Sequence, residues 1–169
     1  MFQVNDIVIY GSHGVCQITS IGTLSISMAD KNKPYYTLRP LYQKSAAVYA
    51  PVENNKTIMR YILSKKEAED LIADLPRIES VWITNEKDRE LQYKAALQTC
   101  DCRELIKIIK TLYMRKEARI QSGKKVTAID EKYFRLAESQ LYEELACALD
   151  IKREQVAPYI ADSLLLHEN

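Results

Sequence analysis

Short apolar runs separated by polar turns fill the first third of the chain, which is a pattern typical of β-strands. One run covers residues 4–10, a turn with two glycines follows at 11–14, and a second run lies within 15–24. β-branched and aromatic residues favour strands, and glycine allows the chain to reverse. Three further runs cover residues 35–41, 46–51 and 57–61. Five short strands with tight connections predict a small β-barrel of SH3 or Tudor type.

From Ser64 onward the spacing of apolar residues changes to the helical period. Ser64 and Glu67 have the spacing of a capping box, and Pro76 ends the helix that they begin. Further helices are predicted over residues 85–98, 101–122, 128–149 and 152–166, and Pro158 either kinks or restarts the last one. We therefore predict an α+β protein of two domains. Residues 1–63 form the five-stranded barrel, and residues 64–169 form an all-α domain of about five helices.

The composition is that of an ordinary globular protein. The chain has 169 residues and is 47% hydrophobic, which is enough to bury a core in one domain or two small ones. Its sequence has no window near the ~20 apolar residues that a membrane span needs, and it begins with no recognisable signal peptide. With four cysteines and no secretion signal, free thiols in a reducing cytoplasm are the better interpretation. We expect a cytoplasmic protein with no membrane partner.

Residues for catalysis are scarce. The two histidines, His13 and His167, lie in a predicted turn and near the end of the chain, and neither has an evident partner for acid–base chemistry. The sequence has no glycine-rich phosphate loop and no nucleophile elbow. Cys100 and Cys102 lack a second pair of ligands at the usual spacing, which disfavours a metal site. We therefore predict no enzyme, no cofactor, no metal and no small-molecule substrate.

One short basic block stands out in a chain whose formal net charge is only +1. Residues 101–126 contain eight lysines and arginines against three acidic residues. Such a cluster can follow a nucleic-acid backbone and release counterions. The alternative is a solvated helix face with local ion pairs. The residues alone leave both interpretations open.

The only tryptophan, Trp82, lies in a predicted linker over residues 77–84. Large apolar side chains can wedge between base steps in the minor groove and kink the duplex. They also serve as packing anchors between chain segments. The residues alone favour packing, and they do not exclude the wedge.

Several motifs, taken in order, resemble the CarD/CdnL family of bacterial transcription regulators. In the first half these are Phe2, Asp6, Val8, Tyr10, His13-Gly14, Tyr35-Tyr36 and residues 48–54. In the second half they are residues 93–97, 103–107, 110–113 and 142–146. The resemblance spans nearly the whole chain.

This resemblance implies a non-enzymatic transcription regulator. Its barrel, of a kind shared with the transcription-repair coupling factor, is expected to bind the RNA polymerase β subunit. Its helical domain is expected to contact double-stranded promoter DNA at the upstream edge of the melting bubble and to modulate the stability of the open complex. Such a protein acts in the bacterial cytoplasm, associated with the nucleoid. The alternative is an adaptor whose barrel binds polymerase and whose helices bind a second protein instead of DNA.

The resemblance also implies two sets of site residues. Tyr49 takes the place of a family arginine that contacts polymerase. The expected polymerase contacts are Arg39, Tyr49, Pro51 and Arg60. Trp82 is the candidate wedge. The expected phosphate contacts are Arg89, Lys94, Lys107, Lys110, Arg115, Lys116, Arg119, Lys124 and Lys125.

Overall fold

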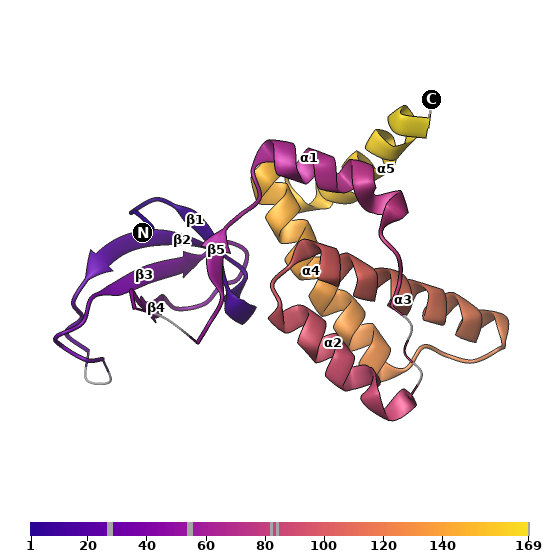
Figure 1. The fold of residues 1–169 in the computed structure, drawn as a ribbon, viewed down its shortest axis with the longest axis horizontal. Coiled ribbons are helices and arrows are strands. Elements are labelled where there is room, and N and C mark those ends of the chain that lie inside the picture. Colours follow the sequence, from indigo (N-terminus) through magenta and orange to yellow (C-terminus); the bar gives the residue numbers. More distant parts are fainter. Residues whose placement is uncertain (27–28, 54–55, 82, 84, 169) are drawn as a thin grey trace. The chain divides into compact units, whose positions relative to one another are not determined.

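The chain divides into two compact units, Met1–Ile62 and Leu63–Asn169 (Figure 1). The computed structural model describes residues 1–26, 29–53, 56–81, 83 and 85–168. Each unit has its own apolar core, because the buried residues form separate clusters within residues 8–50 and 68–156. The two units are described separately below.

The first unit is a five-stranded antiparallel sheet, as predicted. Its strands are β1 (Ile7–Tyr10), β2 (Val15–Gly22), β3 (Tyr35–Pro40), β4 (Val48–Pro51) and β5 (Met59–Tyr61). They lie in the order β4-β3-β2-β1-β5, and every neighbouring pair is antiparallel. The strands β4 and β5 are therefore the two edges of the sheet.

Alternation along the strands builds the core of this unit. Tyr36 and Leu38 on β3 are at most 3% exposed, while their neighbour Arg39 is exposed. Successive residues of a strand point to opposite faces, so one face is buried and the other meets solvent. The core cluster consists of Val8, Tyr10, Cys16, Ile18, Tyr36, Leu38 and Ala50. The Phe2 ring closes this core edge-on, with centroids 5.9 Å from Tyr36 and 4.9 Å from Tyr61.

Strand β1 is shorter than the apolar run that predicted it. It begins at Ile7 because the preceding residues turn, with Asn5 at a φ of 77°. The Asp6 carboxylate accepts the Gln3 N–H at 2.7 Å and the Tyr61 hydroxyl at 3.1 Å, which fixes the turn. At the other end of β1, Gly11 has a φ of 48°, and a Cβ there would lie 2.6 Å from Thr57 Cγ2. Glycine is therefore required at this turn.

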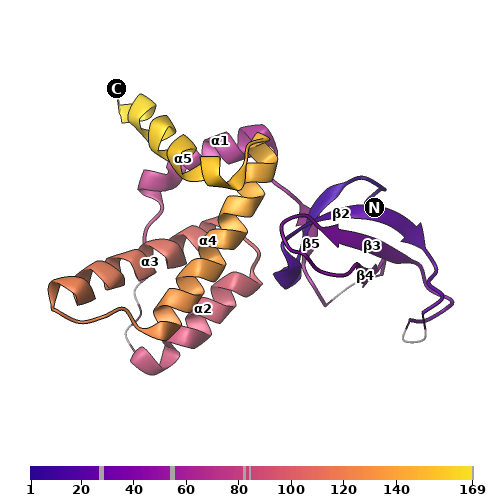
Figure 2. The same cartoon turned by 180° about the vertical axis from the view of Figure 1, so that it is seen from behind.

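The second unit is helical (Figure 2). The described residues contain five α-helices: α1 (Lys65–Asp74), α2 (Arg89–Gln98), α3 (Cys102–Gln121), α4 (Ala128–Leu149) and α5 (Arg153–Glu168). Single 3-10 turns cover Leu75–Arg77 and Glu86–Asp88. The longest helix, α4, packs against α2, α3 and α5. Pro158 lies inside α5, which continues through it.

Local capping sets the helix starts. The predicted capping box of α1 is confirmed, because the Ser64 hydroxyl accepts the Glu67 N–H at 3.1 Å and the Glu67 carboxylate accepts the Ser64 N–H at 3.0 Å. The Thr127 hydroxyl caps α4 at 3.1 Å from the Asp130 nitrogen. The helix predicted from residue 85 begins instead as a 3-10 turn, and α2 starts at Arg89. The Asn85 side chain caps this 3-10 turn by accepting the Lys87 N–H at 3.0 Å.

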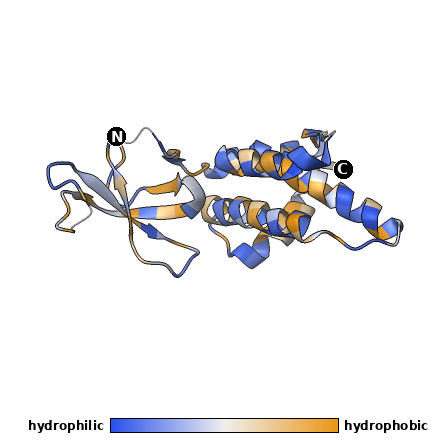
Figure 3. Ribbon diagram, turned by 90° about the horizontal axis from the view of Figure 1, so that it is seen from below, coloured by the Kyte–Doolittle hydropathy of each residue, from blue (hydrophilic) through white to orange (hydrophobic). Residues whose placement is uncertain are grey.

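Two apolar clusters hold the helices together. Figure 3 shows polar and apolar residues interleaved along them, as expected for amphipathic helices. The larger cluster joins α1, α3, α4 and α5 and includes Ile72 and Leu145, each 1% exposed. The smaller cluster consists of Tyr93, Ala96, Ile108, Leu112 and Tyr133. The chain between α1 and α2 reaches this smaller cluster through Val81 and Ile83.

Candidate binding surfaces

Three of the predicted polymerase contacts share one face of the sheet. Tyr49 pairs with Thr37, and Pro51 pairs with Tyr35, across the β3–β4 ladder. Paired residues point to the same face, and Arg39 lies two residues after Thr37 on that face. The Tyr49 side chain is 40% exposed, and Arg39 is exposed with its Nη2 donating to Gln17 Oε1 at 2.8 Å. We call Arg39, Tyr49 and Pro51 the β4 face.

The fourth predicted contact, Arg60, is placed elsewhere. It lies on β5, the opposite edge of the sheet from β4. Its Nη1 donates to the Tyr61 carbonyl oxygen at 3.0 Å. Arg60 therefore lies outside the β3–β4 ladder that carries the β4 face.

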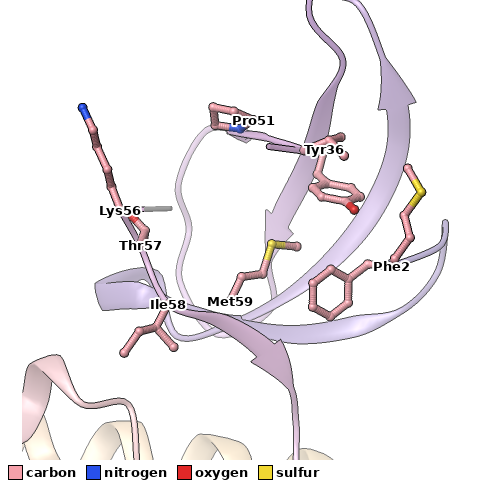
Figure 4. A pocket seen from close by; sticks show the side chains of 9 residues that line it. Phe2, Tyr36, Pro51, Lys56, Thr57, Ile58 and Met59 are labelled. Carbon is pink, nitrogen blue, oxygen red and sulfur yellow. The ribbon is translucent and has the colours of Figure 1, made fainter. Parts of the chain in front are cut away.

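A largely apolar cavity of about 460 Å³ adjoins one end of β4 (Figure 4). Pro51 contributes to its wall together with Phe2, Tyr36 and Met59. Lys56 lies at the same cavity and adds a basic group. Pro51 is therefore shared between the β4 face and a hollow that can accept an apolar side chain.

In the helical unit, two predicted DNA contacts belong to an internal network around Asp130. This carboxylate is 4% exposed and accepts a short hydrogen bond from Arg115 Nε. Arg115 also donates through Nη1 and Nη2 to the two Glu86 carboxylate oxygens, at 2.9 and 3.1 Å. The hydrogen bond from Arg115, with that from Arg89, holds the pKa of Glu86 below its usual value.

Arg89 joins the same network from α2. Its Nε donates to Glu86 at 3.1 Å, and its Nη1 donates to the Tyr93 hydroxyl at 2.9 Å. Tyr93, which is fully buried, in turn donates to Asp130 Oδ1 at 3.0 Å. Burial is the main reason that the pKa of Tyr93 is raised. The side chains of Arg89 and Arg115 are thus already occupied within the fold.

Most of the other predicted phosphate contacts also have partners within the unit. Arg103, a further residue of the basic block that was not among the predicted phosphate contacts, pairs with Asp74 at 2.6 Å, and its hydrogen bond is the main reason that the pKa of Asp74 is lowered. The ammonium of Lys110 donates to two backbone carbonyls. The remaining pairs are Lys107 with Glu104 at 3.1 Å, Lys94 with Glu90 at 3.6 Å, and Arg119 Nε with the Lys125 carbonyl at 2.7 Å.

Three lysines of the basic block remain available to a ligand. Lys116, Lys124 and Lys125 are exposed, on the last turns of α3 and in the loop that follows it. Within the described part of the chain, no carboxylate lies within ion-pair distance of their ammonium groups. We call these three residues the loop lysines.

The candidate wedge, Trp82, lies outside the described residues. Its neighbours Val81 and Ile83 are half-buried and pack against the smaller helical cluster. Both predictions for Trp82, a minor-groove wedge or a packing anchor, therefore stay predictions.

Sequence reasoning missed two buried carboxylates, although a signal for them was present. Asp130 and Glu144 fall on the apolar stripe of α4 together with Ala137 and Leu141. A carboxylate on a buried stripe must find partners inside the fold. Glu144, 2% exposed, accepts the Leu63 N–H at 2.9 Å and the Cys102 thiol at 3.2 Å.

The described residues contain no group of three or more histidine, cysteine or acidic side chains arranged to hold a metal ion. In the same described part of the chain, no helix is both long and apolar enough to cross a membrane.

These features of the first unit define a small antiparallel β domain with an exposed aromatic and basic edge. Residues 2–62 match the CarD-like/TRCF RID domain family. The chain therefore carries an N-terminal CarD-like RNA polymerase-interacting domain, a class of domain that is non-catalytic. The match ends where the sheet unit ends. No curated protein matches the chain.

Proposed function

We propose that this protein is a non-enzymatic bacterial transcription regulator that binds the RNA polymerase β subunit through the β4 face and promoter DNA through its helical unit. It modulates the stability of the open complex, and it does so by binding the open form better than the closed form. Its place of action is the bacterial cytoplasm, at the nucleoid, where polymerase and promoter DNA meet.

The observation that carries the polymerase half of the proposal is the RID-domain match over residues 2–62. An exposed edge strand offers unpaired backbone groups to a partner strand, and β4 is such an edge. Tyr49 supplies an exposed aromatic anchor, and Arg39 supplies a cation on the same face. Tyrosine and arginine are enriched among the residues that dominate binding energy. Pro51 has no N–H and so limits pairing at that end of the strand.

The test is the affinity for cognate core polymerase, measured by biolayer interferometry with the full chain. Tyr49→Ala should weaken binding about tenfold or more, because an interface tyrosine truncated to alanine commonly loses that much. Arg60→Ala tests the predicted contact on the opposite edge of the sheet, and it should lower the affinity less than Tyr49→Ala does if the β4 face is the main contact. A loss with Arg60→Ala and none with Tyr49→Ala contradicts the assignment of the β4 face.

The DNA half of the proposal rests on the loop lysines. They are exposed and have no acidic partner among the described residues, so their charges can neutralise phosphates. A triple variant, Lys116→Gln, Lys124→Gln and Lys125→Gln, should lower the slope of log affinity against log salt by about 2.7 if all three contact duplex phosphates. The charge-matched control is Lys65→Gln, Lys66→Gln and Lys152→Gln, also in the helical unit and also exposed. Equal slopes for the two variants contradict a DNA contact at the loop lysines.

The adaptor remains a second candidate because so many basic residues of the helical unit are paired within that unit. Arg89, Arg103 and Arg115 are each paired with a carboxylate. The positive electrostatic potential at the surface of the unit is therefore weaker than the number of basic residues in the sequence implies. An absence of duplex binding even at low salt, with polymerase binding retained, favours the adaptor over the DNA-contacting regulator.

A further inference from the structure

The chain between α1 and α2 runs along α3 and is held there by two adjacent side chains. Lys110 lies on one turn of α3, and its ammonium donates to the carbonyl oxygens of Leu75 and Ile78. The contact to Ile78 measures 2.5 Å. One lysine thus bridges two carbonyls that are three residues apart.

Thr111 adds a third backbone tie. Its hydroxyl oxygen accepts the Val81 N–H at 2.8 Å and donates to the Lys107 carbonyl at 2.7 Å. The side chain is 9% exposed, so water has little access to these groups. The hydroxyl therefore both donates and accepts a hydrogen bond within the fold.

These ties matter because the segment has little regular structure to satisfy its own backbone. After the 3-10 turn Leu75–Arg77, no helix or strand covers the described residues up to Asn85. Ile78 is 7% exposed, and Val81 packs on the smaller cluster, so the segment lies partly within the fold. Buried backbone groups that lose their partners are expensive to leave unpaired, so Lys110 and Thr111 determine where this segment lies.

We infer that Lys110 and Thr111 are positioning residues that fix residues 75–81, the stretch that directly precedes Trp82 in the sequence, against α3. This inference rests on the proposed contact of the helical unit with promoter DNA, for which the family resemblance makes Trp82 the candidate wedge. It also reassigns Lys110, which acts through the segment and not as a phosphate ligand. The positioned residues lie on the amino-terminal side of Trp82, which is itself outside the described residues.

The sequence provides its own reporter, because Trp82 is the only tryptophan. The experiment uses the full chain without polymerase and measures two quantities: hydrogen exchange of the Val81 amide by NMR, and acrylamide quenching of tryptophan emission. Thr111→Val keeps the branched shape and removes the hydroxyl, and Thr111→Ser restores it. Lys110→Met removes the ammonium, and Lys110→Arg restores a cationic donor. Lys107→Met is the control, since the Lys107 ammonium pairs with Glu104 on the same helix.

Thr111→Val should lower the protection of the Val81 amide by about tenfold or more, as expected for an amide that loses its buried partner. Thr111→Val and Lys110→Met should both change the quenching of Trp82 relative to the wild type, while the serine, arginine and Lys107 variants stay near the wild type. Unchanged protection and unchanged quenching overturn the inference. If Thr111→Val fails to fold, the inference is tested by comparing the quenching of Trp82 in Lys110→Met with that in Lys110→Arg.

A separate measurement keeps this inference distinct from the proposed function. The lifetime of the promoter open complex is measured with wild type, Trp82→Ala and Thr111→Val. If Trp82→Ala leaves the lifetime unchanged, the wedge is refuted, and the exchange and quenching results still decide whether Lys110 and Thr111 position the segment. If Trp82→Ala shortens the lifetime and Thr111→Val does not, the segment is not positioned for DNA contact and the inference is wrong.

Discussion

Replacing Asp130 by asparagine tests whether the buried ionic network stabilises the helical unit. The Asp130 carboxylate is 4% exposed and has two donors, Arg115 Nε and the Tyr93 hydroxyl. The asparagine side chain keeps the size of the original and removes its charge. Arg115 then loses one of its two acidic partners, while the pair with Glu86 remains. The substitution therefore leaves a half-buried cation partly uncompensated.

The expected loss is about 3 kcal/mol of unfolding free energy. Breaking a buried ion pair by removing one partner costs about 3–5 kcal/mol, and the remaining contact between Arg115 and the exposed Glu86 places the value at the lower end. Tyr93→Phe should cost about 1–2 kcal/mol, because it removes the hydroxyl that links Arg89 to Asp130. Since the two groups share a hydrogen bond, the double variant should lose less than the sum of the single losses.

The assay is urea denaturation followed by the helical signal in far-UV circular dichroism, which reports the second unit. The matched control is Glu131→Gln, which neutralises the adjacent carboxylate on the same helix. Glu131 is exposed and pairs with the exposed Arg135 at 3.2 Å, so its loss should stay below about 0.5 kcal/mol. If Asp130→Asn costs no more than Glu131→Gln, the network does not stabilise the unit.

Three further perturbations follow from burial and capping. Burial raises the pKa of Cys16 from about 9 to about 11, so the thiol ionises at lower pH in the unfolded chain than in the folded one. The unfolding free energy should therefore fall as the pH rises from about 9 to about 11, by up to about 3 kcal/mol. Urea titrations across that range, followed by amide NMR signals of the sheet unit that contains Cys16, should give a shallower decline for Cys16→Ala. Ser64→Ala removes the hydroxyl of the capping box and should cost about 1 kcal/mol, measured by urea denaturation followed by far-UV circular dichroism. Leu145→Ala, at a position 1% exposed, should cost about 3 kcal/mol, and a loss below that of Ser64→Ala would refute its central place in the core.

Local signals predicted the fold well. The Ser64 capping box and the Thr127 cap depend on residues three apart, so the sequence displays them directly. The strands followed from alternation, with the exception of the start of β1, where the turn-forming pair Asn5-Asp6 was counted within the predicted run. The five-stranded sheet and the five helices are confirmed.

The candidate sites were harder to predict because they depend on contacts between distant residues. In the sequence, Arg89 and Arg115 look like exposed cations of two helices. In the structure, Arg115 binds Asp130 on another helix, and Arg89 reaches the same carboxylate through Tyr93. The placement of Arg60 and Tyr49 on opposite edge strands depends on the strand order, in which the last strand pairs with the first. The ties from Lys110 and Thr111 to residues 75–81 join positions about thirty residues apart. Periodicity within one helix cannot indicate such partners.

The lifetime of the promoter open complex tests the central proposal most directly. Cognate polymerase on a labelled promoter is challenged with competitor, alone, with the wild-type protein, and with the triple glutamine variant of Lys116, Lys124 and Lys125. We predict a longer lifetime with the wild type and a lifetime near that of polymerase alone with the variant, although both bind polymerase equally. An unchanged lifetime with the wild type, at concentrations that saturate polymerase, contradicts a role in stabilising the open complex.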